Sequence, residues 1–375
     1  MISKLLIAGA GAGKTTWLVN QALSLTDKVL ITTFTDVNTD SIKRKIFEIN
    51  GYIPHNIVVM PWFSFLLKYG VKPYQNSVCN ISISGLLLVE SKSGIRFTLS
   101  NGKPVYYGEK DPLQYYFDKT GRIYSDKIAK FVVSSNKNTK GLVFNRIKRI
   151  FPNIYVDEIQ DLAGYDLEII KGLYKEGVNL LMVGDPRQVT YLTHNESKNK
   201  KYSSGRIEDF VRAFCKEVEI DTLTLNRSYR NHPLICDYAN MLYPQMAPCQ
   251  SCSRFTSFHD GIFFITPDLV ESYINLYHPI QLRDKRSVKV SDNALVFNFG
   301  ESKGLTFDRV LIYPTNPMKA WLANASSELK PESRSRLYVA ITRAKFSVAF
   351  VVDKQFLYSR HNIVHWREAD YHESS

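Results

Sequence analysis

The chain reads AGAGAGKTT at residues 8–16, directly after the apolar run Leu5-Leu6-Ile7. A glycine-rich loop between a strand and a helix is typical of phosphate-binding proteins, because its backbone N–H groups wrap around the anion. In such loops the lysine reaches the outer phosphates of a nucleotide, and the hydroxyl that follows it holds Mg²⁺. An ordinary glycine-rich turn is the alternative, and the Gly-Lys-Thr ending argues against it. We therefore expect a nucleotide to contact Ala10, Gly11, Ala12, Gly13, Lys14, Thr15 and Thr16.

Apolar runs and helix-like segments alternate along the first 60 residues. Alternation of this kind is typical of parallel sheets covered by helices, so we expect an α/β fold. The pattern breaks at residues 70–140, which contain short strand-like pieces such as 95–99. A polar loop or linker is expected at 193–206. The predicted strands end at Ala8 or lie at 29–32, 57–60, 154–156, 180–183, 222–225, 294–297, 310–313 and 347–352, with early helices from about Thr15 and at 40–48.

The composition indicates a folded protein of more than one domain that binds a polyanion. The length of 375 residues exceeds one ordinary core, and 44% hydrophobic with 22% charged residues fits a folded chain. The net charge is +12, and residues 66–150 hold 15 Lys and Arg against 5 Asp and Glu, interspersed with aromatic residues. Cations that follow phosphates and rings that stack on bases suit a single nucleic-acid strand. A solvated basic surface over an aromatic core is the alternative.

A cluster of acidic residues follows a second apolar run, in IYVDEIQDL at residues 154–162. Packed carboxylates repel one another, and a bound metal ion is the usual compensation. If this strand belongs to the same sheet as the phosphate loop, Asp157 binds the nucleotide's Mg²⁺ and Glu158 activates the attacking water. The pair therefore predicts hydrolysis of a nucleoside triphosphate.

Further segments match a set of motifs in a fixed order along the chain. DEIQD (157–161) fits Asp-Glu-x-Gln-Asp, VGDPRQVTY (183–191) is similar to Gly-Asp-x-x-Gln, and SYRNHP (228–233) to Asn-Tyr-Arg-Ser. The others are TTFTDVNTDSIKRKI (32–46), WFSF (62–65), ESKGLTFDRVLIYPT (301–315) and LYVAITRAK (337–345). Together with the phosphate loop, these segments resemble the UvrD/Rep-type helicases of superfamily 1.

The resemblance implies a role for particular residues. Gln188 senses the γ-phosphate of ATP, Arg230 contacts the same phosphate, and Arg343 acts as an arginine finger. Core packing is the alternative for Phe34 and Trp62. Further nucleotide contacts are implied at Tyr191 and Gly304, and strand contacts at Phe34, Thr35, Trp62, Phe63 and Ser64. The basic composition of residues 66–150, and not the resemblance, makes Lys127 and Lys130 candidate phosphate contacts.

The chain also departs from the family pattern. Seven residues precede Ala8, so the glutamine that reads adenine is not expected, and Thr16 stands where arginine is common. The tryptophan shortly after the position of Tyr191 is replaced in YLTHNE. About seventy residues separate Arg230 from Ser302, too few for the large second-domain insertion of full members. We expect a minimal version of the family.

The resemblance implies two RecA-like parallel-sheet domains with a small basic domain inserted in the first. The expected boundaries are 1–66 with 142–205 for the first sheet domain, 67–141 for the inserted accessory domain and 206–375 for the second sheet domain. ATP would lie between the sheet domains, with Lys14 and Mg²⁺ from the first and Arg230 and Arg343 from the second. ATP hydrolysis would change in turn how tightly each sheet domain binds the nucleic-acid strand.

The implied function is an ATP-dependent DNA translocase and helicase that moves 3′ to 5′. The expected partners are single-stranded or tailed duplex DNA, in preference to RNA, and a loading or regulatory protein; membrane contact is not expected. The expected location is the cytoplasm of a bacterium or of a phage or virus host. Three alternatives remain open: a viral-type superfamily 1 RNA helicase, a regulatory NTPase that unwinds nothing, and a small-metabolite kinase that shares only the phosphate loop.

The five cysteines suggest free thiols in a reducing compartment. CQSC (249–252), with Cys236 and His259, is a candidate zinc site. A single C-x-x-C without a second pair favours free thiols instead.

Overall fold

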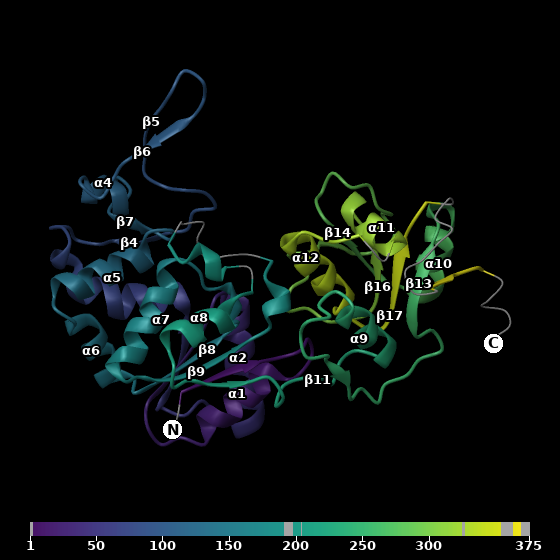
Figure 1. The fold of residues 1–375 in the computed structure, drawn as a ribbon, viewed down its shortest axis with the longest axis horizontal. Helices are drawn as coiled ribbons and strands as arrows, with labels where there is room; N and C mark the ends of the chain where they lie inside the picture. Colours follow the sequence, from purple (N-terminus) through teal and green to yellow (C-terminus); the bar gives the residue numbers. More distant parts are fainter. Residues whose placement is uncertain (1–2, 191–197, 204, 325–326, 354–362, 369–375) are drawn as a thin grey trace. The chain divides into compact units, whose positions relative to one another are not determined.

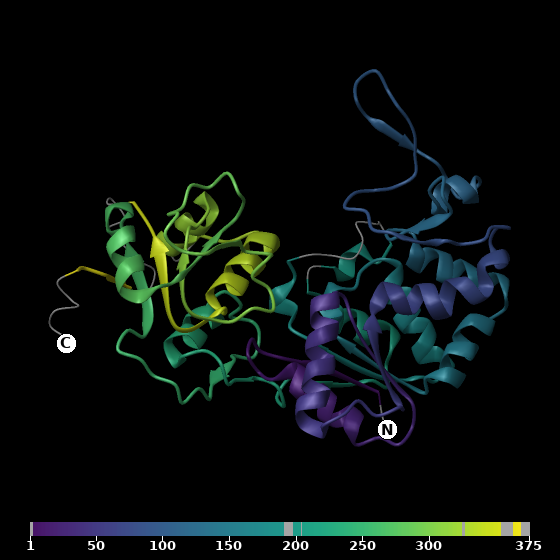
Figure 2. The ribbon, with the colours of Figure 1, turned by 180° about the vertical axis from the view of Figure 1, so that it is seen from behind.

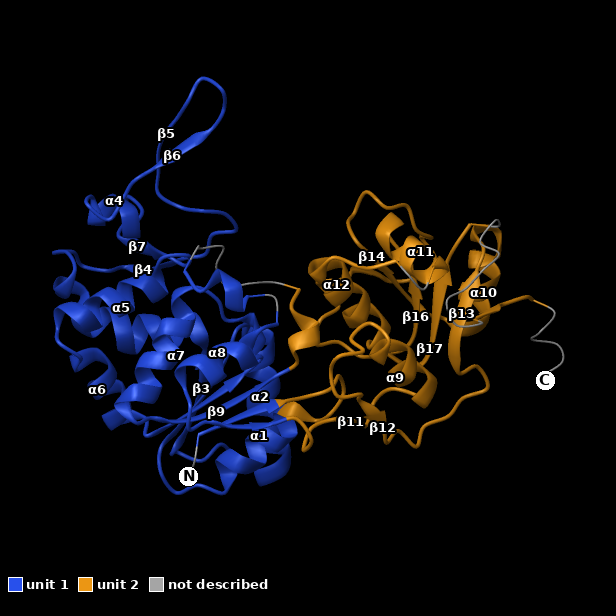
Figure 3. Ribbon diagram, in the orientation of Figure 1, with its two compact units in different colours: residues 1–6, 15–184, 192–221 blue, residues 7–14, 185–191, 222–375 orange. Residues whose placement is uncertain are grey.

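The computed structural model describes residues 3–190, 198–203, 205–324, 327–353 and 363–368. The chain forms two compact units, shown in blue and orange in Figure 3. Unit 1 comprises residues 1–6, 15–184 and 192–221, and unit 2 comprises residues 7–14, 185–191 and 222–375. Residues 8–14 of the phosphate loop therefore belong to unit 2, as do Arg230 and Arg343. The domain boundaries drawn from the sequence stay a prediction.

Sheet 1 has, within the described ranges, six strands in the order β10-β1-β9-β8-β2-β3 (Figure 1). Strand β2 pairs in parallel with β3 and β8, β8 with β9, and β1 with β10. Strand β8 is buried along its whole length, as expected for a parallel strand covered on both faces. The bounds are β1 (Lys4–Ile7), β2 (Val29–Thr33), β3 (Ile57–Pro61), β8 (Asn153–Asp157), β9 (Asn179–Gly184) and β10 (Glu219–Asp221).

Helices lie on both faces of sheet 1. The chain crosses the sheet in one direction through α1 (Lys14–Leu23) and α2 (Asp36–Asn50), and in the other through α7 (Tyr165–Glu176). Because crossovers between parallel strands are right-handed, α1 and α2 share one face and α7 takes the other. Figure 1 shows α7 in front of β8 and β9, and Figure 2 brings the purple helices forward. The other helices of unit 1 are α3 (Trp62–Phe65), α4 (Pro112–Tyr116), α5 (Ile128–Asn138), α6 (Leu142–Ile150) and α8 (Ile207–Phe214).

The ends of α2 follow from two residues of the sequence. The Thr35 side chain accepts a hydrogen bond from the N–H of Asn38 at the start of the helix. At the other end Gly51 adopts φ +80°, and its N–H donates to the carbonyl of Phe47. Such caps satisfy backbone groups that a helix leaves without partners. They extend the helix beyond the predicted range of 40–48.

Residues 67–141 lie within unit 1 and consist mostly of short elements. The π-helix η1 (Leu66–Val71) and the 3₁₀-helix η2 (Lys72–Ser77) lead into two small sheets. Parallel β4 (Gly85–Leu87) and β7 (Arg122–Tyr124) form one, and antiparallel β5 (Ile95–Thr98) and β6 (Pro104–Tyr106) form the other. Strand β5 is exposed along its length, and Figure 1 shows the β5–β6 hairpin extending away from the helices of unit 1.

Sheet 2 belongs to unit 2 and, in the described part of the chain, has six parallel strands. Their order is β15-β14-β16-β17-β13-β18. A separate short pair joins β11 (Arg227–Ser228) to β12 (Gln250–Ser251). The sheet 2 strands are β13 (Gly261–Ile265), β14 (Ile280–Arg283), β15 (Val296–Asn298), β16 (Phe307–Ile312), β17 (Ala344–Val351) and β18 (Val364–His365).

Alternate residues of β17 enter two cores on opposite faces of sheet 2. Val348 and Phe350 join the core formed with α9 (Pro233–Asn240), α11 (Asn316–Ala323) and α12 (Pro331–Ile341). Ala349 and Val351 join the core formed with α10 (Val270–Tyr277). The α/β class with parallel sheets covered by helices is therefore confirmed.

The strand predicted at 222–225 is wrong. The chain leaves sheet 1 after Asp221, and residues 222–225 form a turn in which Leu223 is 72% exposed. The carbonyl of Leu225 accepts a hydrogen bond from the N–H of Gly9, so this part of the backbone bonds to the phosphate loop and not to a sheet strand. Part of the predicted loop at 193–206 lies outside the described residues, and 198–203 contains the turn η5 (Lys200–Tyr202). Each helix of the described ranges is too short or too polar to cross a bilayer.

Candidate functional site

Thr15 and Asp157 meet at the carboxyl edge of sheet 1. Thr15 lies in the first turn of α1, and Asp157 is the last residue of β8. The Thr15 Oγ1 atom lies 3.4 Å from Oδ2 of Asp157, which is buried. Hydroxyl and carboxylate oxygens are the ligands that Mg²⁺ prefers in proteins. These two residues therefore fit the metal role predicted for them.

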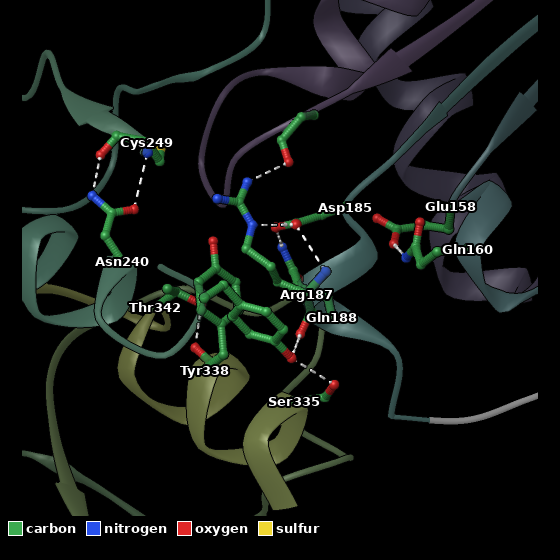
Figure 4. A network of polar contacts seen from close by, with 12 residues as sticks. Glu158, Gln160, Asp185, Arg187, Gln188, Asn240, Cys249, Ser335, Tyr338 and Thr342 are labelled. Carbon is green, nitrogen blue, oxygen red and sulfur yellow. Dashed lines mark hydrogen bonds and ion pairs between the residues drawn. The ribbon is translucent and has the colours of Figure 1, made fainter. Parts of the chain in front are cut away.

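Glu158 adopts a backbone conformation that is rare for a residue with a side chain. Its φ of +55° and ψ of +41° are left-handed. Its N–H donates to Asp157 Oδ1 at 3.0 Å, and its carboxylate accepts a hydrogen bond from Gln160 Nε2 (Figure 4). Left-handed strain of this kind persists only where the surroundings impose it, and it concentrates at functional sites. The strain therefore supports a specific role for Glu158.

Gln160 reaches its position because the neighbouring strand ends in glycine. A Cβ atom at Gly184, the last residue of β9, would lie 2.2 Å from Gln160 Oε1 and 2.9 Å from Ile159 Cγ2. Both atoms would have to move before any other residue could stand there. The glycine of the VGDPRQ segment therefore leaves the space that Gln160 and Ile159 of the DEIQD segment occupy.

The SYRN segment packs directly on the phosphate loop within unit 2. The N–H of Tyr229 donates to the carbonyl of Gly11 at 3.0 Å. A Cβ atom at Gly11 would lie 2.6 Å from Ser228 Oγ and 2.7 Å from Arg230 Cβ. Gly11 also adopts φ +71°, which disfavours any residue with a side chain. Both the space and the backbone conformation at this position therefore require glycine.

Arg343 is buried, and its guanidinium makes hydrogen bonds inside unit 2. Nη2 lies 3.2 Å from Gln188 Oε1, while Nη1 and Nε each donate to a backbone carbonyl, of Leu305 and Val339, at 3.1 Å. Only 2% of the residue is exposed. Two residues predicted to act on the γ-phosphate thus contact each other.

Asn231 joins the SYRN segment to the backbone on both sides of Arg343. Its Nδ2 atom donates to the carbonyls of Thr342 at 3.0 Å and of Ala344 at 2.6 Å. Arg230 Nη1 lies 3.4 Å from the same Thr342 carbonyl. Asn231 was not predicted from the sequence. The signal that would have found it is an asparagine directly after the motif arginine.

The remaining loop residues differ in exposure. Ala10 and Ala12 are buried, whereas Gly13 and Thr16 are exposed. Gly13 has φ +74°, and a Cβ atom there would meet no described atom within 4 Å. Gly13 directly precedes the first turn of the ten-residue helix α1, a position that favours anions in general. The last two predicted nucleotide contacts are Gly304, exposed with φ +86°, and Tyr191, which lies outside the described residues.

The WFSF segment is largely part of the core of unit 1. Trp62 is 1% exposed, and its Nε1–H donates to Asp166 Oδ1 at 2.7 Å. Phe63 is also buried and packs edge-to-face on the half-buried Phe34, with ring centroids 5.4 Å apart. Ser64 is exposed. The geometry favours the core-packing alternative for Trp62, and Thr35 acts as the helix cap described above.

Replacing Trp62 by phenylalanine is expected to destabilise the fold by about 1–3 kcal/mol, because the buried bond to Asp166 is lost. The affinity for single-stranded DNA should stay unchanged. Trp366→Phe is a matched control, since Trp366 is also buried and donates its indole N–H to Tyr277 Oη. Urea unfolding and fluorescence anisotropy measure the two effects. A large loss of affinity in stably folded Trp62→Phe protein, absent in the control, would instead indicate base stacking.

Lys127 and Lys130 are held by partners within unit 1. Lys127 is 2% exposed and forms an ion pair with Asp126 at 3.0 Å. Lys130 Nζ lies 2.7 Å from Glu109 Oε1 and 3.0 Å from Tyr115 Oη. A phosphate would have to compete with these contacts. Exposed cations of the same basic segment include Lys92, Arg96 and Lys103, which lie on or beside the β5–β6 hairpin.

The thiols and His259 show no arrangement typical of a zinc site. Cys236 and Cys249 are buried free thiols, and Cys252 is exposed. The His259 ring is stacked between Phe263 and Tyr277, with centroids 4.1 and 3.9 Å away. Among the described residues, His, Cys, Asp and Glu side chains form no group of three or more that could hold a metal ion. The free-thiol interpretation is favoured.

Burial of His259 predicts acid sensitivity. Burial, assisted by the charge of Arg309, lowers the pKa of His259 from 6.5 to about 4. The unfolded chain then takes up a proton at a higher pH than the folded chain does. The contribution of His259 to stability is therefore complete above pH 6.5 and lost as the pH falls toward 4.

Thermal unfolding across this pH range should show a loss of stability that His259→Phe reduces. His278→Asn alters an exposed histidine with φ +48°, a conformation that asparagine tolerates, and should leave the pH dependence unchanged. Identical pH profiles for wild-type and His259→Phe protein would contradict the assignment.

Comparison with known proteins gives one family match and two curated relatives. Residues 113–204 match the UvrD/REP helicase N-terminal domain. An ATP-dependent helicase/nuclease component from Carboxydothermus hydrogenoformans is 26% identical over 107 residues, which cover 28% of this chain and 8% of the relative. The RecBCD enzyme subunit RecB from Borreliella burgdorferi is 30% identical over 113 residues, which cover 28% of this chain and 10% of the relative. The chain thus spans about a tenth of the length of these relatives.

One similar solved structure is that of the arterivirus nonstructural protein 10 (helicase) in complex with DNA. It aligns with 94% of this chain and 62% of its own, at 13% identity and a TM-score of 0.47, a likeness too weak to bear on function. The family match is more informative, because residues 113–204 contain both DEIQD and VGDPRQ. The resemblance to UvrD/Rep-type helicases that the motifs predicted is therefore confirmed by a matching UvrD/REP helicase N-terminal domain.

Proposed function

We propose that this chain is a helicase-type motor that couples Mg²⁺-dependent ATP hydrolysis to movement along single-stranded DNA from 3′ to 5′. The observation that carries the proposal is the convergence of distant motifs on the phosphate loop within unit 2. The SYRN segment packs on Gly11, and the side chains of Gln188 and Arg343 contact each other. The match to a UvrD/REP helicase domain supports the same class of activity.

Each predicted catalytic group has a defined task under this proposal. The N–H groups of the loop and the Lys14 ammonium neutralise the outer phosphates of ATP. Arg230 and Arg343 add positive charge where negative charge develops on the transferred group. Glu158 orients the attacking water and accepts its proton. Thr15 and Asp157 would hold Mg²⁺, which would supply further positive charge to the phosphate oxygens.

The proposal extends to the substrate and the partners of the motor. A net charge of +12 and the exposed cations of the basic segment favour a nucleic-acid strand as the substrate. We include Thr35 and Ser64, both exposed, and the half-buried Phe34 among the strand contacts. A cytoplasmic location and a loading or regulatory protein belong to the same proposal.

Strand displacement with labelled duplexes tests this function. The full chain is incubated with ATP and Mg²⁺ on duplexes that carry a 3′ or a 5′ single-stranded tail of DNA or RNA. Displacement that requires a 3′ DNA tail is the expected result. ATP hydrolysis that DNA stimulates without any strand displacement would indicate a translocating or regulatory NTPase. A preference for RNA tails would indicate an RNA helicase. Displacement only from 5′ tails would overturn the proposed direction.

A further inference from the structure

Arg187, the third residue after the glycine of the VGDPRQ segment, lies at the centre of a buried polar network in unit 2 (Figure 4). Only 3% of Arg187 is exposed. Its Nε atom donates to Asp185 Oδ1 at 2.8 Å, and Nη2 donates to the Ala8 carbonyl at 2.9 Å. Its guanidinium also lies over the Tyr338 ring, 5.3 Å from the centroid. One side chain therefore contacts the VGDPRQ segment, the phosphate loop and the LYVAITRAK segment.

The same carboxylate continues the network to the predicted γ-phosphate sensor. Asp185 Oδ1 also accepts the N–H of Arg187 at 3.2 Å, while Oδ2 accepts Gln188 Nε2 at 2.7 Å. Because the amide of Gln188 donates to Asp185, its carbonyl oxygen is turned toward Arg343 Nη2. The orientation of Gln188 thus depends on how Arg187 holds Asp185.

The chemistry of the pocket requires arginine in particular. Burial would by itself lower the pKa of Arg187, but Asp185 and Tyr338 outweigh burial and raise it, so the guanidinium stays charged. A planar guanidinium can donate to a carboxylate and a carbonyl at fixed angles while it stacks on a ring. A lysine ammonium retains the charge but lacks this fork. Lysine at this position therefore keeps the charge balance of the pocket and removes its geometry.

We propose that Arg187 is a positioning residue. It holds the phosphate loop through its bond to the Ala8 carbonyl and orients the Gln188 side chain through its bond to Asp185. The loop and the γ-phosphate sensor are then aligned before ATP binds. The catalytic part of this inference rests on the proposed ATP hydrolysis. The structural part, that Arg187 holds the loop, does not.

Arg187→Lys is the informative variant, and Arg309→Lys is its matched control. Arg309 is also partly buried, lies over the rings of Phe258 and Phe346 at 5.1 and 5.5 Å, and donates to Ser257 Oγ. The Arg309→Lys variant therefore loses similar ring and hydrogen-bond contacts at a place away from the phosphate loop. Thermal unfolding should show a comparable change for both variants, which separates a general loss of stability from a loss of positioning.

Amide hydrogen exchange in the nucleotide-free chain tests the structural part. Peptides that cover residues 8–14 should exchange faster in Arg187→Lys than in wild-type or Arg309→Lys protein. This readout needs no ATP turnover. Equal exchange of the loop in all three proteins would overturn the proposal, whatever their activity.

Steady-state kinetics test the catalytic part. We expect Arg187→Lys to reduce kcat at least about tenfold, since small misplacements of reacting groups cost that much or more. Arg309→Lys should keep the wild-type kcat. If Arg187 acts through Gln188, the double variant Arg187→Lys/Gln188→Ala should turn over at nearly the rate of the slower single variant.

The outcomes separate this inference from the proposed function. Effects of Arg187→Lys and Gln188→Ala that multiply fully, or an unchanged kcat in Arg187→Lys, would overturn the positioning role. Wild-type protein without ATP hydrolysis would instead refute the proposed function, and the exchange measurement alone would then decide whether Arg187 holds the loop.

Discussion

Replacing Lys14 by alanine is expected to reduce ATP turnover by about 10³-fold or more, because catalysis of phosphoryl transfer relies on positioned positive charge. Lys14 begins α1 directly after the exposed Gly13, at a helix start that favours anions. The substitution removes the ammonium and keeps a good helix former at this position. The circular dichroism spectrum and the unfolding temperature should therefore change little.

Lys43→Ala is the control for the loss of a lysine from a helix of the same chain. Lys43 lies on α2 and forms an exposed ion pair with Asp40 at 3.6 Å, a contact that contributes little to stability. Its removal should leave ATP turnover unchanged. Turnover in Lys14→Ala protein within a few-fold of the Lys43→Ala value would show that the phosphate loop does not take part in hydrolysis.

Glu158→Gln is expected to keep ATP bound and to reduce hydrolysis by about 10²- to 10⁴-fold, the range for loss of a general base. Glutamine has the same shape as glutamate, and its oxygen can still accept the hydrogen bond from Gln160. The left-handed backbone of residue 158 should be retained, because the substitution alters only the end of the side chain. Rapid-quench measurements with labelled ATP separate binding from hydrolysis.

Glu48→Gln provides the matched change at an exposed carboxylate, which is paired with Lys45 on α2. It should hydrolyse ATP at the wild-type rate. Hydrolysis in Glu158→Gln protein at the rate of Glu48→Gln protein would show that Glu158 does not activate the attacking water.

The fold class could be predicted because burial leaves a direct mark on the sequence. Strand β8 is buried on both faces and reads as a continuous apolar run before Asp157. The segment 222–225 alternates Thr and Leu, a pattern typical of a strand, but it forms a turn. Its backbone bonds to the phosphate loop at Gly9, a contact between distant parts of the chain that local pattern cannot reveal.

The candidate site was predictable where residue type alone fixes the chemistry. Thr15 and Asp157 follow from the phosphate loop and the acidic pair, and the structure brings them together. Lys127 shows the opposite case, because a lysine in a basic segment is usually exposed, yet here it is buried beside Asp126. The role of Trp62 was ambiguous because aromatic residues occur both in protein cores and in contacts with nucleic-acid strands.

Arg187 could not be predicted because it occupies an unspecified position of Gly-Asp-x-x-Gln, whereas Asn231 is marked only by its place directly after the motif arginine. Their importance comes from backbone carbonyls that they reach, at Ala8 for Arg187 and at Thr342 and Ala344 for Asn231. Carbonyl acceptors are present at every residue, so no side-chain pattern marks them. Only the folded chain shows which carbonyls these side chains contact.

The most direct measurement of the central claim is ATP turnover by the full chain with Mg²⁺, with and without single-stranded DNA, beside Lys14→Ala and Glu158→Gln protein. Turnover of the wild-type chain should rise at least several-fold when the strand is added and should nearly vanish in both variants. Wild-type turnover that is no faster than that of either variant, with or without the strand, would contradict the claim.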